Sequence, residues 1–124
     1  NQSKFFIAAG PNDENLVKKI MDSPIGKRCI SLCNLNIEQM IPIFASCNAC
    51  VSNDSGFGHL AANLGKKVVM VFCDTPVSAY GLWSPNIKVV VPEGETIEST
   101  KHNTRGKSRV SFQTVFKKSL ELIS

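Results

Sequence analysis

Short apolar runs alternate with helical patterns along this chain. The runs are typical of strands, and they lie at Lys4–Ala9, Arg28–Cys33, a stretch starting at Ala49, Val68–Cys73 and Ile87–Val91. The first ends at Gly10-Pro11 and its continuous hydrophobicity predicts a strand buried on both faces. Strands that alternate with helices predict an α/β fold, in which a parallel sheet carries helices on both faces.

Three helices follow from apolar positions at helical spacing. The first opens at Asn12-Asp13-Glu14, the second runs from Asn36 through Ala45 and contains Pro42, and the third starts near Ser111. Pro42 is expected to kink or split the second helix. We expect the following side chains to face the core: Leu16, Val17, Ile20, Ile37, Met40, Ile41, Phe44, Phe112, Val115, Phe116, Leu120 and Ile123.

The stretch from Ala49 to Gly65 predicts a strand, a polar turn with two glycines and a helix of small residues. Ser55 is placed to cap the helix through its hydroxyl, while Gly56 and Gly58 leave the first backbone N–H groups uncovered. A helix N-terminus carries about half a positive charge, so a phosphate over residues 55–59 would meet aligned donors. His59 lies in the first turn and could donate to the same phosphate.

Asp54 fits a phosphate site poorly, because a carboxylate repels a diphosphate. We therefore expect it to shape the loop or to bind a sugar hydroxyl. An ordinary capped turn without a ligand remains an alternative, since turns rich in Gly, Ser, Asp and Asn occur in all folds.

The composition narrows the choice of partners. The 124 residues fit one domain, and a net charge of +4 favours anionic partners only mildly. No apolar run approaches the roughly 20 residues of a membrane span, and residues 1–4 show no signal-peptide pattern, so we expect a cytoplasmic protein. Residues 92–107 lack apolar periodicity and predict a mobile loop with a basic half, but stacking aromatics are not interleaved with its charges, so nucleic acid is not expected as a partner.

The five cysteines favour reduced core thiols, since their number is odd and their neighbours are apolar. Cys29, Cys33, Cys47 and Cys50 approach the spacing of a zinc site. However, residues four apart on a strand lie about 13 Å apart, at roughly 3.3 Å per residue, which is too far for one metal. We therefore expect no metal site.

The residues from Val51 to Gly56, then His59-Leu60-Ala61-Ala62, Leu64-Gly65-Lys66, Val68–Phe72 and Thr75, resemble the donor-binding half of the ADP-heptose:lipopolysaccharide heptosyltransferases, glycosyltransferase family 9. That family shows Asp-Thr-Gly, two variable residues and His-Leu-Ala-Ala, and then Phe-Gly-Pro-Thr after the next strand. Here Ser55 replaces the threonine and Cys73-Asp74 replaces Gly-Pro. The resemblance covers roughly residues 4–91 and implies a Rossmann-like fold, the C-terminal half of a GT-B glycosyltransferase.

The resemblance also implies the roles of site residues. Asp54, Ser55 and Gly56 would form the loop under the donor diphosphate, with the N–H groups through Phe57, Gly58 and His59 completing it. Leu35 would line the adenosine, Asp13 or Glu14 would lie near the ribose or sugar, and Thr75 would stand at the rim of the cleft.

The implied reaction is an inverting, metal-independent transfer from an ADP-heptose-like nucleotide sugar during synthesis of the lipopolysaccharide core. No cofactor is expected. Residues 1–124 would be a single nucleotide-sugar-binding domain, and the catalytic base and the acceptor site would belong to an absent N-terminal lobe, so that this fragment alone would have little activity. The setting would be a Gram-negative cytoplasm, with peripheral contact to the inner membrane. The alternative is a non-catalytic nucleotide-binding domain on the same scaffold.

Overall fold

The computed structural model describes residues 2–124, and its contacts group them into two compact units. One extends to Pro42 and the other runs from Ile43 to Ser124. Helix α2 (Ile37–Ser46) spans the division. That the two units form one domain stays a prediction.

The first unit contains a two-stranded parallel sheet and one longer helix. Strand β1 (Phe5–Ile7) pairs with β2 (Cys29–Ser31), with Phe5 opposite Cys29. Between them lie α1 (Glu14–Met21) and a 3₁₀ helix over Pro24–Arg28. The predicted burial of the first strand on both faces is wrong, because Phe5 and Phe6 are 40% and 38% exposed. A sheet of two short strands has too little surface to enclose them.

Helices α1 and α2 bury narrower stripes than the periodicity predicted. On α1 only Val17 is buried, and on α2 Met40 and Phe44 are. The other apolar residues assigned to the core are exposed, namely Leu16, Ile20, Ile37 and Ile41. Asn36 caps α2 through its side-chain oxygen, which accepts from the N–H of Gln39, and the helix runs without interruption through Pro42.

The second unit contains a three-stranded parallel sheet of order β3-β4-β5. Strands β3 (Ala49–Asn53), β4 (Lys67–Val71) and β5 (Ile87–Val90) are in register, with Val68 opposite both Cys50 and Ile87. The central strand lies where its β-branched sequence predicted a strand, and its Val68, Val69 and Met70 are fully buried. The α/β class and the parallel pairing are therefore confirmed, although the described strands form two sheets and not one.

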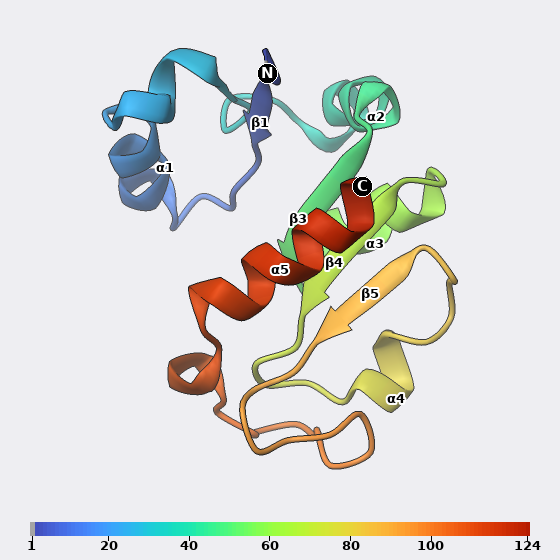
Figure 1. The fold of residues 1–124 in the computed structure, drawn as a ribbon. Helices are drawn as coiled ribbons and strands as arrows, with labels where there is room; N and C mark the ends of the chain where they lie inside the picture. Colours follow the sequence, from blue (N-terminus) through green and yellow to red (C-terminus); the bar gives the residue numbers. More distant parts are fainter. Residues whose placement is uncertain (1) are drawn as a thin grey trace. The chain divides into compact units, whose positions relative to one another are not determined.

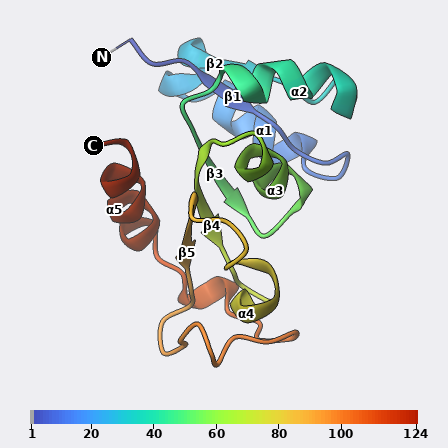
Figure 2. The same cartoon turned by 90° about the vertical axis from the view of Figure 1, so that its right-hand side faces the viewer.

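Helices cover both faces of this second sheet. Figures 1 and 2 show α5 (Phe112–Ile123) on one face, and α3 (Gly56–Asn63) and the short α4 (Val77–Tyr80) on the other. Beneath α5, Leu122 packs in a core cluster with Val69, Val71 and Val90.

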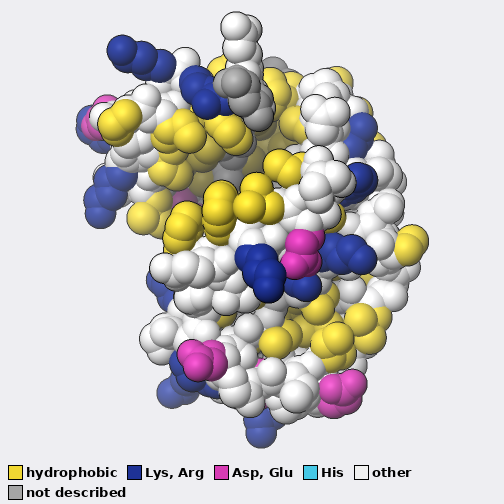
Figure 3. Space-filling view, in the orientation of Figure 1, with side chains coloured by type: hydrophobic (Ala, Val, Ile, Leu, Met, Phe, Trp, Pro, Cys, Tyr) yellow, Lys and Arg dark blue, Asp and Glu magenta, His cyan; other side chains and the backbone are white. Residues whose placement is uncertain are grey.

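Helix α5 presents a second apolar stripe to solvent, which contradicts its predicted burial. The helix starts where it was predicted, and the Ser111 hydroxyl caps it by accepting from the N–H of Thr114 at 3.1 Å. Yet Phe112, Phe116, Leu120 and Ile123 are all exposed, and hydrophobic side chains lie along this helix beside Lys and Arg side chains (Figure 3). Helical spacing identifies residues that share a face, but not the element that the face meets.

The segment from Pro92 to Lys107, predicted to be mobile, is tied to the end of β4. The N–H of Gly106 donates to the carbonyl of Cys73 at 2.7 Å, and the N–H of Arg105 donates to the Asp74 carboxylate, also at 2.7 Å. A Cβ at Gly106 would lie 2.1 Å from the ring of Pro92, so only glycine fits there. None of the helices over residues 2–124 has the length and apolarity that a membrane crossing requires.

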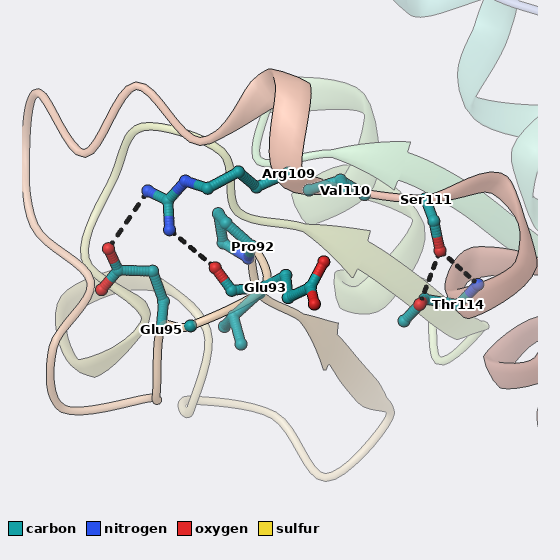
Figure 4. A pocket seen from close by; sticks show the side chains of 9 residues that line it. Pro92, Glu93, Glu95, Arg109, Val110, Ser111 and Thr114 are labelled. Atoms are coloured by element: carbon teal, nitrogen blue, oxygen red, sulfur yellow. Dashed lines mark hydrogen bonds and ion pairs between the residues drawn. The ribbon is translucent and has the colours of Figure 1, made fainter.

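Arg109, which follows this segment in the chain, forms hydrogen bonds with residues near the start of the segment. Its guanidinium donates to the carbonyl of Glu93 at 2.7 Å and to the Glu95 carboxylate at 3.2 Å (Figure 4). Hydrogen bonds from Ser99 and Arg109 lower the pKa of Glu95. Glu93, Glu95 and Arg109 border a pocket of about 300 Å³ after β5. The Arg109 guanidinium is already paired with Glu95, so the residues that line this pocket offer no free cationic group to an anion.

Candidate functional site

The candidate site lies where β3 and β4 end at the carboxyl edge of the second sheet. In parallel α/β sheets this edge is where ligands bind. The turn between β3 and α3 is fixed to the neighbouring strand, since the N–H of Asp54 donates to the carbonyl of Val71 at 3.0 Å. This bond sets the position at which α3 begins.

The start of α3 leaves backbone donors uncovered, but not through the predicted cap. Ser55 is the N-cap residue, yet its hydroxyl lies 3.1 Å from the hydroxyl of Ser52 and accepts no backbone N–H. The N–H of His59 is used by the carbonyl of Ser55 at 3.2 Å. Among residues 2–124, no acceptor meets the N–H groups of residues 56–58. Backbone donors of this kind at a helix N-terminus can bind an anion.

The two glycines of the turn have different roles. A Cβ at Gly56 would meet no atom within 4 Å, as expected of a residue that keeps the donors open. A Cβ at Gly58 would lie 2.8 Å from Met70 and 3.0 Å from the side chain of Ser52. Gly58 is therefore required for close packing of α3 on the sheet, and the expectation that it clears space for a ligand is wrong.

A chain of hydrogen bonds links four side chains around the turn. The Thr75 hydroxyl donates to Oδ2 of Asp54 at 2.5 Å, and Oδ1 of Asp54 lies 2.7 Å from Nε2 of His59. The indole N–H of Trp83 donates to Nδ1 of His59 at 3.2 Å. Since the indole nitrogen can only donate, Nδ1 must accept, which places the imidazole proton on Nε2, where it donates to Asp54.

This network defines what Asp54 and His59 can do. The Asp54 side chain is only 12% exposed and each of its oxygens accepts a hydrogen bond, which fits the expected role in loop geometry. Both ring nitrogens of His59 are engaged, so in this arrangement the ring has no donor left for a phosphate. Thr75, expected at the rim, is brought directly to Asp54.

The remaining predicted residues have other surroundings. Phe57 is half-buried, and its ring lies 6.0 Å from that of Phe44 between centroids. Leu35 lies half-buried in the turn after β2, and Asp13 and Glu14 are exposed at the start of α1. These three belong to the first unit, and their contact with a donor stays a prediction.

Sequence reasoning missed Trp83 in this network. It follows α4 in an irregular turn, and nothing in its neighbours along the chain indicates a bond to a histidine 24 residues earlier. The only available signal was that a lone tryptophan in a polar loop tends to find a partner for its N–H.

Burial disfavours the ionised form of two thiols in the second unit. Burial raises the pKa of Cys50, on β3, to about 11, and burial also raises the pKa of Cys73. All five cysteines are free. Over residues 2–124 no three His, Cys, Asp or Glu side chains gather as metal ligands would.

A family model matches this sequence. The sequence model of glycosyltransferase family 9 (heptosyltransferase) matches residues 2–108, a span that includes the turn, the hydrogen-bond network and both sheets. Comparisons with curated proteins and with solved structures find no match. Because the family match covers most of the chain, the protein belongs to glycosyltransferase family 9, the heptosyltransferase family.

Proposed function

We propose that the second unit binds the diphosphate of a nucleotide-sugar donor at the start of α3. The observation that carries the proposal is the set of three N–H groups at residues 56–58 that have no acceptor among the described residues. Membership of a glycosyltransferase family supplies the ligand class, because such enzymes use activated sugars.

The backbone donors of the turn between β3 and α3 are suited to stabilising a diphosphate leaving group. When the sugar departs, negative charge grows on the diphosphate, and fixed backbone donors near a helix N-terminus stabilise that charge. Asp54 already accepts from Thr75 and His59, so we assign it to holding the turn and not to deprotonating an acceptor.

We base the donor, the acceptor and the type of reaction on the family. The donor would be an ADP-heptose-like sugar, transferred with inversion and without a metal to the lipopolysaccharide core. Leu35 would contact the adenosine, and Asp13 or Glu14 the ribose or sugar. The base that activates the acceptor would belong to an N-terminal lobe. The reaction would take place in the cytoplasm, at the inner membrane.

A panel of nucleotides tests the ligand class. ADP, UDP, GDP and their sugars are added to the chain and the midpoint of thermal unfolding is measured. A nucleotide at 100 times its Kd stabilises the fold by about 2.7 kcal/mol, which raises the midpoint by several degrees. We expect the largest shift with ADP or an ADP-sugar, whereas no shift with any diphosphate would contradict the proposal.

The variant Asp54→Ala tests the assigned role of the carboxylate. It removes both acceptor oxygens, so the Thr75 hydroxyl and the Nε2–H of His59 lose their shared partner. We expect weaker ADP binding with the secondary structure retained, measured by calorimetry and circular dichroism. Unchanged affinity would remove Asp54 from the site.

A further inference from the structure

We propose that Trp83 is a positioning residue of the anion-binding turn: its indole N–H orients His59, which orients Asp54, so the turn has its binding shape before a ligand arrives. The inference rests on the proposed function of the turn. It adds a residue that the family's motif does not contain.

The geometry places the indole at the end of the hydrogen-bond network. Its N–H reaches Nδ1 of His59 at 3.2 Å, and the two rings lie 5.9 Å apart between centroids at an angle of 32°. Trp83 is 48% exposed, which is high for a tryptophan and indicates that burial alone does not hold it there. The polar contact with His59 therefore accounts for much of its orientation.

The Trp83–His59 hydrogen bond matters because an imidazole ring that is held through only one nitrogen can still rotate. Asp54 holds His59 only through Nε2, and the His59 side chain is 28% exposed, so without Trp83 its Nδ1 would face water. With both nitrogens engaged the ring has one orientation and one tautomer.

The ring orientation passes to the backbone of the turn. Asp54 is the residue before the N-cap Ser55, and its carboxylate is held between Thr75 and His59. A turn that is ordered in advance loses less conformational entropy when a diphosphate binds to residues 56–58. Trp83 thus acts on affinity through His59 and not by touching the phosphates.

The composition makes the test unusually clear. The chain has one tryptophan and two histidines, so a nuclear magnetic resonance spectrum contains one indole N–H signal and two imidazoles to distinguish. Trp83→Phe keeps an aromatic ring and removes the donor. Tyr80→Phe is the matched control, because Tyr80 is an exposed aromatic of the same region whose ring contacts His102, at 6.0 Å, in place of His59.

The first measurement uses the ligand-free chain. We expect Trp83→Phe to shift the Nδ1 signal of His59 and the amide signals of residues 54–59, and Tyr80→Phe to leave them in place. His59→Ala should shift the indole signal, whereas His102→Ala should not. If Trp83→Phe left the His59 ring and the turn unchanged, the positioning role would be refuted whatever the chain binds.

The second measurement is ADP titration by calorimetry. Loss of one hydrogen bond between neutral groups predicts an affinity about three to ten times weaker for Trp83→Phe, and an unchanged affinity for Tyr80→Phe. Equal affinity of Trp83→Phe and the wild-type chain would overturn the inference while leaving the proposed function intact. Failure of the wild-type chain to bind ADP would instead refute the proposed function, and the ligand-free spectra would then decide the role of Trp83.

Discussion

Replacement of Gly58 by alanine separates packing from ligand access at the start of α3. A Cβ at this position would lie 2.8 Å from Cε of Met70 and 3.0 Å from both Cβ and Oγ of Ser52. The Met70 methyl is the end of a flexible side chain, but Met70 is fully buried, so the methyl has little room to turn away. Ser52 belongs to β3, and its Cβ can move only with the strand.

Two opposing free-energy contributions determine how much Gly58→Ala changes the stability of the fold. Alanine is favoured over glycine in a helix by about 1 kcal/mol, whereas an extra methyl group in a packed site costs about 1–3 kcal/mol. Because strand β3 cannot move without disturbing its pairing with β4, we expect the upper part of that cost, and a net loss of about 1–2 kcal/mol for Gly58→Ala.

Gly56→Ala is the matched control, since its Cβ would meet nothing within 4 Å. We expect this variant to be unchanged or up to about 1 kcal/mol more stable. Urea denaturation followed by circular dichroism measures both free energies of unfolding. If Gly58→Ala proved as stable as Gly56→Ala, the packing role of Gly58 would be wrong.

Three further predictions concern other parts of the second unit. Thr75→Val should lose about 1.5–3 kcal/mol of unfolding free energy, because it removes a donor to the largely buried Asp54 carboxylate, while Thr75→Ser should retain most of it; equal losses would contradict the bond. Since burial raises the pKa of Cys50 from 9.0 to about 11, the unfolded thiol ionises first, and stability should fall by about 1–2 kcal/mol as the pH rises through this range; Cys50→Ala should abolish that part of the fall in a pH series of urea titrations. Leu122→Ala should cost about 2–5 kcal/mol and Phe112→Ala less than about 1 kcal/mol, and the reverse order would show that the stripe on α5 is buried.

The sequence predicted those parts of the fold that depend on local pattern. The apolar run at Val68–Cys73 gave the central strand, and the polar turn after Asn53 gave the start of α3 in the right place. Both signals are local, because a β-branched run and a glycine-rich turn each restrict their own backbone.

The failed predictions all concerned which partner a residue meets. Ser55 has the chemistry of a helix cap, but the hydroxyl of Ser52 on the preceding strand engages it instead. Phe112 and its stripe have the spacing of a core face, but α5 contacts the sheet through the side that carries Leu122. Partners of this kind are set by the packing of elements distant in sequence, which periodicity does not report.

The candidate site likewise contains residues that the sequence predicted and contacts that it did not. Asp54 and Gly56 were predicted from the turn itself, because a short polar residue and a glycine act within their own loop. Thr75 was predicted only from the resemblance to the family's motif, and its bond to Asp54 joins two loops. The bond from Trp83 to His59 depends on how the turn after α4 folds back over α3, and the use of both His59 nitrogens follows only from that bond.

The most direct test of the account compares ADP with adenosine in a nuclear magnetic resonance titration of the chain. If the backbone donors of residues 56–58 hold a diphosphate, ADP should shift the amide signals of Gly56, Phe57 and Gly58 most strongly, and adenosine should leave these three signals in place. Equal effects of the two ligands on these amides, or ADP shifts concentrated elsewhere in the chain, would contradict the central claim.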